Sequence, residues 1–221
     1  MGNQSFGIDG NVTKRIALDI KEARELGVQI GIVVGGGNIF RGVAVAAQGG
    51  DRVTGDHMGM LATVMNALSL QAALHEAGVD STVLSALTMP QVCETFTHTA
   101  ARRYLREGRV VLFAGGTGNP YFTTDTGAAL RAAEMRCDAL FKATQVDGIY
   151  TADPKKDPTA QRYDEVTYDE VISKNLKVMD TAAIALARDN DIPVVVFSIA
   201  ERGALREILL GGGISTTVKV A

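Results

Sequence analysis

Residues 110–125 read VVLFAGGTGNPYFTTD, and this stretch decides the class of fold. Its first five residues form an apolar run that is typical of a buried strand, and residues 126–136 read as a helix. A polar, glycine-rich loop at the carboxyl end of a strand is where open α/β sheets bind ligands. The alternative is a long surface turn, although a plain connection needs only about 2–6 residues.

Strand-like and helix-like segments alternate along most of the chain, which predicts an α/β fold with a mainly parallel sheet. We expect helices over residues 11–26, 53–77, 97–107, 126–136, 180–190 and 202–210. Strands are expected over residues 28–34, 79–87, 109–114, 139–144, 193–198 and 216–220. Asn11 is the expected cap of the first helix. Residues 147–162 lose the periodicity and gain prolines, so they read as a loop excursion.

Composition excludes several classes of protein. With 221 residues, the chain is long enough for one large α/β domain or two small ones. A net charge of −3 does not provide the excess of positive charge that binding to nucleic acid requires. No apolar run approaches the roughly 18 residues of a membrane-spanning helix, and the polar start lacks a signal-peptide pattern. Cys93 and Cys137 fit lone thiols in a reducing cytoplasm, and three histidines without metal-ligand spacing argue against zinc.

The helix expected over residues 53–77 is apolar on two sides. One stripe holds Met58, Leu61, Met65 and Leu68, and the other holds Met60, Val64 and Leu74. A helix that is apolar on more than one face is buried on both sides. Either the core of the chain or a partner subunit covers the additional stripe, and the sequence leaves both alternatives open.

A second glycine-rich segment, residues 35–42, reads GGGNIFRG and also follows an expected strand. Consecutive backbone N–H groups in such a turn form an anion-binding concavity. The guanidinium of Arg41 suits phosphate oxygens, the alternative being a solvated surface arginine. The pattern is neither the dinucleotide fingerprint nor the Walker loop. Two such loops, each after its own strand, indicate ligand binding more strongly than either loop alone.

Several carboxylates are candidates for chemistry. Asp56 lies near the start of the long helix, where it either caps the helix or accepts hydrogen bonds from ribose hydroxyls; His57 beside it reads as a packing residue. The other candidates are Asp125, Asp138, Asp147, Asp153 and Asp180. Carboxylates near a triphosphate usually hold Mg²⁺ or orient a lysine, whereas each one alone is more often a cap or a solvated charge.

In combination these segments resemble the bacterial uridylate (UMP) kinases of the amino-acid-kinase superfamily. The matching stretches cover nearly the whole chain: residues 6–9 (FGID), 35–42, 55–66 (GDHMGMLATVMN), 116–125, 142–154 (KATQVDGIYTADP) and 177–180 (KVMD). The resemblance implies a three-layer αβα sandwich, with residues 1–221 as a single domain. Its acceptor-binding half would be about 1–145 and its ATP-binding half about 146–221.

The resemblance also implies an activity: transfer of the γ-phosphoryl group of Mg·ATP to UMP, giving UDP and ADP in pyrimidine nucleotide biosynthesis. UMP would be held by Gly36, Asp56, Thr117, Gly118, Asn119, Pro120, Tyr121, Phe122, Thr123 and Thr124. The ATP side would comprise Gly37, Arg41, Thr144, Tyr150 and Asp153. Asp180, with Asp125 or Asp138, would organise the reacting groups, and Arg41 would lie near the transferred group.

Assembly and regulation follow from the same resemblance. It implies a homohexamer built from dimers, with GTP as an activator and UTP as an inhibitor, and the two-striped helix fits a dimer contact. This chain has Gln71 and Thr82 where some members carry arginine, which argues against the GTP response.

The chain departs from the family at its start. Members begin with a strand and a Lys-x-Ser-Gly-Glu turn that this sequence does not contain, which predicts impaired transfer and lower stability. A noncatalytic nucleotide-binding or storage protein on the same fold is therefore an alternative. A kinase that acts on a carboxylate or carbamate is a third, and Asp56 with residues 117–124 argues against it.

Overall fold

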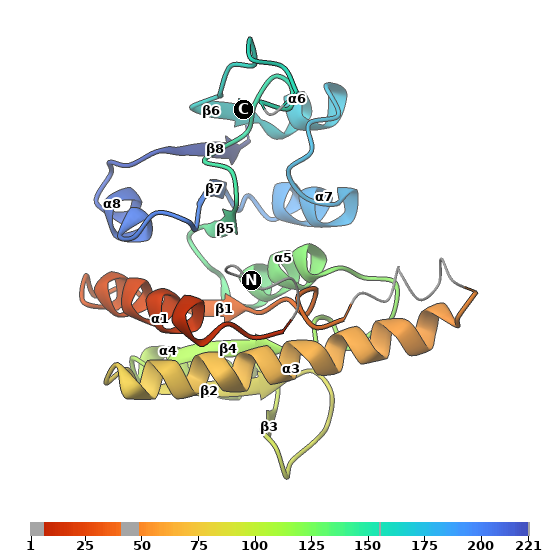
Figure 1. Ribbon diagram of the computed structural model, residues 1–221, viewed down its shortest axis with the longest axis vertical. Helices are drawn as coiled ribbons and strands as arrows, with labels where there is room; N and C mark the ends of the chain where they lie inside the picture. Colours follow the sequence, from red (N-terminus) through yellow and green to blue (C-terminus); the bar gives the residue numbers. More distant parts are fainter. Residues whose placement is uncertain (1–6, 41–48, 155, 221) are drawn as a thin grey trace. The chain divides into compact units, whose positions relative to one another are not determined.

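The computed structural model describes residues 7–40, 49–154 and 156–220 (Figure 1). The chain divides into two compact units, Met1–Arg131 and Ala132–Ala221, and each has its own sheet and its own core. The predicted α/β class with mainly parallel strand pairing is confirmed in both units. The single domain with halves that meet near residue 145 stays a prediction.

The sheet of the first unit is entirely parallel, in the strand order β1-β4-β2-β3. Its strands are β1 (Gly31–Val33), β2 (Ser81–Ser85), β3 (Glu94–Thr95) and β4 (Val110–Ala114). All of β4 is buried, as a parallel strand covered on both faces should be. Because successive side chains alternate, Val110 and Leu112 join the core with α3, whereas the Phe113 ring packs against Phe96.

Helices of the first unit pack onto this sheet and onto one another. They are α1 (Gly10–Arg24), α3 (Arg52–Glu76) and α4 (His98–Arg106), and α5 (Thr124–Met135) runs from the first unit into the second. α3 contacts α1, β2 and β4, and α4 contacts β4. The cap of α1 is Asp9 and not the predicted Asn11, because the Asp9 carboxylate accepts hydrogen bonds from the N–H groups of Asn11 and Val12.

The two apolar stripes of α3 have different surroundings. Met60, Val64 and Leu74 are buried, and Leu68 packs partly against the same core. Met58, Leu61 and Met65 are instead 44%, 49% and 53% exposed. The core therefore covers only one stripe, and the alternative that it buries both is wrong for these three residues.

The second unit holds a mixed sheet in the order β5-β7-β8-β6. Its strands are β5 (Leu140–Thr144), β6 (Glu165–Thr167), β7 (Val194–Ser198) and β8 (Ser215–Lys219), and its helices are α6 (Tyr168–Ser173), α7 (Thr181–Asp189) and α8 (Ala204–Leu209). β5 and β7 are parallel, as are β6 and β8, whereas β7 and β8 are antiparallel. In the described ranges, no helix combines the length and the apolar character needed to cross a bilayer.

Candidate active site

Asp56 lies one turn inside α3, and two groups fix its carboxylate. The Nε atom of Arg52 is 2.8 Å from both oxygens, and the backbone N–H of Tyr121 donates to Oδ2 over 2.8 Å. The helix cap is Asp51, whose carboxylate accepts from the N–H of Thr54, so the capping role considered for Asp56 is wrong. Asp56 therefore ties α3 to the loop at residues 115–125, which we call the acceptor loop.

The turn at residues 35–38, which we call the glycine turn, also lies against α3. The N–H groups of Ile39 and Phe40 both donate to the carbonyl of Gly36 over 2.9 Å. A Cβ atom at Gly36 would lie 2.6 Å from the carbonyl oxygen of Gly59, so this approach to the helix requires glycine. The predicted site residue Arg41 and its neighbour Gly42 lie outside the described residues.

Hydrogen bonds within the acceptor loop add to the bond that Asp56 accepts from it. Thr117 and Asn119 bond to each other through side chain and backbone at 3.2–3.3 Å. The hydroxyl of Thr123 accepts from the N–H groups of Asp125 and Thr126, which is how a threonine caps a helix. Tyr121 has φ +71°, a left-handed conformation that non-glycine residues seldom adopt. Tyr121 and Phe122 are 67% and 52% exposed, and the Arg52 guanidinium lies 5.4 Å from the centre of the Tyr121 ring.

The glycine turn and the acceptor loop meet where α5 begins. A Cβ atom at Gly35 would lie 3.6 Å from the Oγ1 atom of Thr124, and one at Gly127 would lie 3.4 Å from the Cα atom of Gly116. Backbone N–H groups at the start of α5 favour a negative ligand group. The first unit thus brings together four residues predicted to hold UMP, namely Gly36, Asp56, Tyr121 and Thr124.

Two residues predicted to contact ATP, Thr144 and Tyr150, lie in the second unit and have hydrogen-bonded hydroxyl groups. The Thr144 hydroxyl accepts from the N–H of Val146 over 2.8 Å and donates to its carbonyl. The Tyr150 hydroxyl donates to Oδ1 of Asp147 over 2.7 Å, and this hydrogen bond raises the pKa of Tyr150.

The predicted excursion at residues 147–162, which we call the hairpin loop, is closed at its base. Tyr150 and Arg162 form an antiparallel bridge, and the N–H of Thr151 donates to the carbonyl of Gln161 over 2.9 Å. At its tip, the backbone carbonyl of Asp153 accepts two N–H groups, from Lys156 and Asp157. The excursion is thus a folded loop that holds Tyr150 and Asp153 on one short segment.

The remaining carboxylates lie at helix ends. Asp180 caps α7, and its Oδ1 accepts from the N–H of Ala183 over 3.0 Å. Asp125 lies in the first turn of α5, and Asp138 is exposed between α5 and β5. Among the residues that the structure describes, no group of three or more His, Cys, Asp and Glu side chains could hold a metal ion.

Sequence reasoning missed two side chains that touch the predicted site. Thr63 and Asn66 of α3 bond to the acceptor loop and to the glycine turn, respectively. Their spacing from Asp56, seven and ten residues, places them on the same face of the helix. Polar residues at this spacing within an otherwise apolar stretch were the sequence pattern that could have indicated their role.

Comparison with known proteins identifies the family. The model described as "Amino acid kinase family" matches residues 1–198. The chain belongs to the amino acid kinase family. Within that family, it is 66% identical over 218 residues to the uridylate kinase of Brucella anthropi, an alignment that covers 99% of this chain and 91% of the relative.

Solved structures of this family agree with the fold. The UMP kinase from Ureaplasma parvum superposes with a TM-score of 0.94 at 36% identity, over 99% of this chain and 93% of the other. The UMP kinase from Bacillus anthracis gives a TM-score of 0.95 at 37% identity, over 99% and 90%.

Proposed function

We propose that this chain is a UMP kinase, which transfers the γ-phosphoryl group of ATP to UMP and yields UDP and ADP. The observation that carries the proposal is the acceptor site built on α3, where Asp56 binds the backbone of Tyr121 and Gly36 lies against the helix. High identity to uridylate kinases over 99% of the chain gives independent support.

In the proposed reaction, a phosphate oxygen of UMP attacks the γ-phosphorus of ATP. The bond from that phosphorus to the oxygen bridging it to the β-phosphorus breaks, and ADP leaves. Little covalent chemistry is required of the protein, so its contribution is positioning and neutralisation of charge. The acceptor loop and Asp56 hold UMP, and Thr144, Tyr150 and Asp153 hold ATP. Arg41, Asp125 and Asp180 act on the transferred group.

Magnesium belongs to the proposal as the ion that accompanies ATP. It is commonly held by one or two carboxylates together with substrate phosphates and does not need a cage of protein ligands. Asp125 and Asp180, each taken within its own unit, have carboxylate oxygens of the kind that Mg²⁺ binds. When bound, the ion would neutralise negative charge on the phosphate oxygens.

A coupled assay for ADP release tests the proposal. UMP is the acceptor, and CMP, aspartate and glutamate derivatives are the controls. We expect release with UMP and a much lower rate with the other acceptors. Calorimetric binding of UMP and ATP without UDP formation would select the noncatalytic alternative, and transfer to a carboxylate would contradict the choice of acceptor.

We also propose a hexamer built from dimers, in which the exposed stripe of α3 forms the dimer contact. Met58, Leu61 and Met65 lie side by side on α3 and are 44–53% exposed, as expected of an apolar patch that a second copy covers. Light scattering should give a six-chain mass that falls for Leu61→Glu. Val92→Glu, at an apolar residue of similar exposure outside the stripe, is the control. A native monomer would contradict the proposal.

GTP activation, UTP inhibition, a cytoplasmic location and a role in pyrimidine nucleotide biosynthesis stay predictions. Gln71 donates from Nε2 to the carbonyl of Ser81 over 3.1 Å, so a neutral amide occupies one of the two positions where some family members carry arginine. Rates measured with and without GTP test the activation.

A further inference from the structure

Three polar side chains of α3 form one row on the face that meets both loops of the acceptor site. Asp56, Thr63 and Asn66 recur at a spacing of seven and then three residues, which keeps them on one side of a helix. We call them the polar row. Gly59 lies between them, and its carbonyl oxygen faces Gly36.

Thr63 attaches the acceptor loop at its first residue. Its Oγ1 accepts from the N–H of Gly115 over 2.7 Å and donates to the carbonyl of Met60 over 2.7 Å. Thr63 is 5% exposed, so both bonds lie away from water. Gly115 has φ +75°, and a Cβ atom there would lie 3.2 Å from the backbone nitrogen atoms of Ala86 and Leu87. The hydroxyl therefore satisfies a buried N–H at the point where the chain leaves β4.

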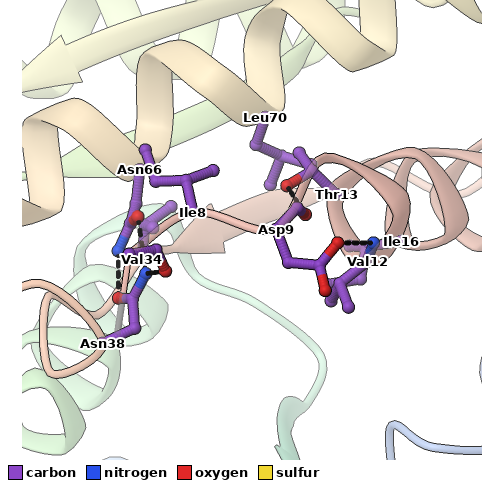
Figure 2. Close-up of a pocket in the computed structure, with 10 residues that line it drawn as sticks. Ile8, Asp9, Val12, Thr13, Ile16, Val34, Asn38, Asn66 and Leu70 are labelled. Carbon is purple, nitrogen blue, oxygen red and sulfur yellow. Dashed lines mark hydrogen bonds between the residues drawn. The ribbon is translucent and has the colours of Figure 1, made fainter. Parts of the chain in front are cut away.

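Asn66 attaches the glycine turn through a pair of amides. Its Nδ2 donates to the carbonyl of Gly35 over 2.7 Å and to Oδ1 of Asn38 over 2.6 Å. Asn38 returns a hydrogen bond from Nδ2 to Oδ1 of Asn66 over 3.1 Å, and it also donates to the carbonyl of Gly7 over 2.8 Å. Figure 2 shows the two amides facing each other, joined by these bonds.

A hollow of about 190 Å³ lies beside this amide pair. Figure 2 shows Val34, Leu70 and Ile8 around it together with Asn38 and Asn66. Side chains that border a hollow have fewer packing neighbours to fix them. The amide hydrogen bonds therefore hold the glycine turn at Gly35 and Asn38, whereas close packing against the helix holds it at Gly36.

We infer that Thr63 and Asn66 are positioning residues of the acceptor site. Asp56 and Thr63 fix the acceptor loop at Tyr121 and Gly115, and Asn66 fixes the glycine turn at Gly35 and Asn38. Because all three groups project from one rigid helix, they set the spacing between the two segments that bind UMP. The identity of the substrate in this inference rests on the proposed function. The positioning of the two segments rests on the hydrogen bonds alone.

Thr63→Val and Asn66→Leu test the inference, because each keeps the size of the side chain and removes its hydrogen bonds. Thr63→Ser restores the hydroxyl. Gln71→Leu is the matched control, since it removes a side-chain bond from the same helix to the carbonyl of Ser81, away from both loops. We expect kcat/KM for UMP to fall by up to about 10²-fold in the first two variants, the size of loss that a misplacement of about 1 Å can produce. KM for ATP stays near its native value, and Thr63→Ser recovers most of the loss.

Hydrogen exchange gives a readout that does not depend on activity. Peptides covering residues 35–40 and 115–125 should lose protection in Thr63→Val and Asn66→Leu but keep it in Gln71→Leu. Unchanged protection, or a loss of kcat/KM no greater than that of Gln71→Leu, would overturn the inference. If the native chain forms no UDP while these peptides respond as expected, the proposed function fails and the positioning of the loops stands.

Discussion

The acceptor loop and the hairpin loop are held by different kinds of support. Side chains of one helix bind the backbone of the acceptor loop at two of its N–H groups, those of Gly115 and Tyr121. The hairpin loop is instead closed by its own bridge and attached to a strand, because the Thr216 hydroxyl accepts from the N–H of Ile149 over 2.9 Å and donates to the carbonyl of Tyr163. Helix side chains thus control the first loop, and sheet geometry controls the second.

Loss of Asp56 should produce the largest effect, because one carboxylate holds both Arg52 and Tyr121. In Asp56→Ala we expect kcat/KM for UMP to fall on the order of 10²-fold or more as the loop leaves its position. Asp56→Asn keeps an acceptor for the N–H of Tyr121 and should lose less. Steady-state kinetics with UMP as the varied substrate measure these losses. The control is the cap variant Asp51→Ala, which should lose about 1 kcal/mol of stability. Equal losses in Asp56→Ala and Asp51→Ala would refute the role of Asp56.

Gly36→Ala probes the contact of the glycine turn with the helix. The added methyl group would meet the carbonyl oxygen of Gly59 at 2.6 Å, so we expect the free energy of unfolding to fall by about 1–3 kcal/mol. Gly59→Ala is the matched comparison. A Cβ atom at Gly59 meets nothing within 4 Å, and replacing a helical glycine stabilises by about 0.5–1 kcal/mol. Urea unfolding of both variants should therefore give changes of opposite sign, and a stabilised Gly36→Ala would be incompatible with this packing.

Thr216→Val tests the support of the hairpin loop. Thr216 is fully buried, and its loss leaves the N–H of Ile149 without its hydroxyl acceptor, which should cost about 1–3 kcal/mol of stability. We expect KM for ATP to rise and KM for UMP to stay near native, the reverse of the pattern for Asp56→Ala. Thr217→Val, on the same strand and partly exposed, is the control. A change confined to KM for UMP would show that the two loops are not supported separately.

The effect that is smallest at neutral pH concerns the titration of Tyr168 in the second core. Burial raises the pKa of Tyr168 to about 12, and its hydroxyl donates to the carbonyl of Ile192. The unfolded chain has a tyrosine pKa near 10. The folded state therefore favours the protonated phenol. This preference stabilises the fold fully below about pH 10, and the stabilisation is lost as the pH rises through about 12. Unfolding of Tyr168→Phe should lack this fall between pH 10 and 12, and an identical slope in both proteins would exclude Tyr168 as its source.

Elements that belong to a longer apolar or periodic run could be predicted from the sequence, even the three-residue β1, whereas β3, β6 and α6 could not. The run at residues 110–114 is apolar throughout, so its burial as β4 follows from composition. β3 and β6 span two and three residues, too few for a periodicity to show. α6 was missed although Thr167 and Glu170 form a capping box, a pattern that marks a helix start.

Within the site, the sequence indicated residue types but not contacts. Asp56 was a candidate, yet its bond to the N–H of Tyr121 joins positions 65 residues apart, which no local pattern records. Thr63 reads as one more small residue of a buried helix face, because only the fold brings Gly115 within 2.7 Å of it. Arg41, predicted on the ATP side, lies outside the described residues and stays a prediction.

The left-handed conformation of Tyr121 has an energetic cost that is similar in size to the contribution of its hydrogen bond to Asp56. Holding a non-glycine residue in that conformation costs about 1–3 kcal/mol. A hydrogen bond to a charged acceptor, such as the one that the N–H of Tyr121 donates to Asp56, contributes about 1.5–3 kcal/mol. Because the two quantities are similar, the hydrogen bond to the Asp56 carboxylate oxygen offsets the cost of the left-handed conformation at Tyr121. A ligand hydroxyl that competes for this oxygen would act on the backbone as well as on the charge.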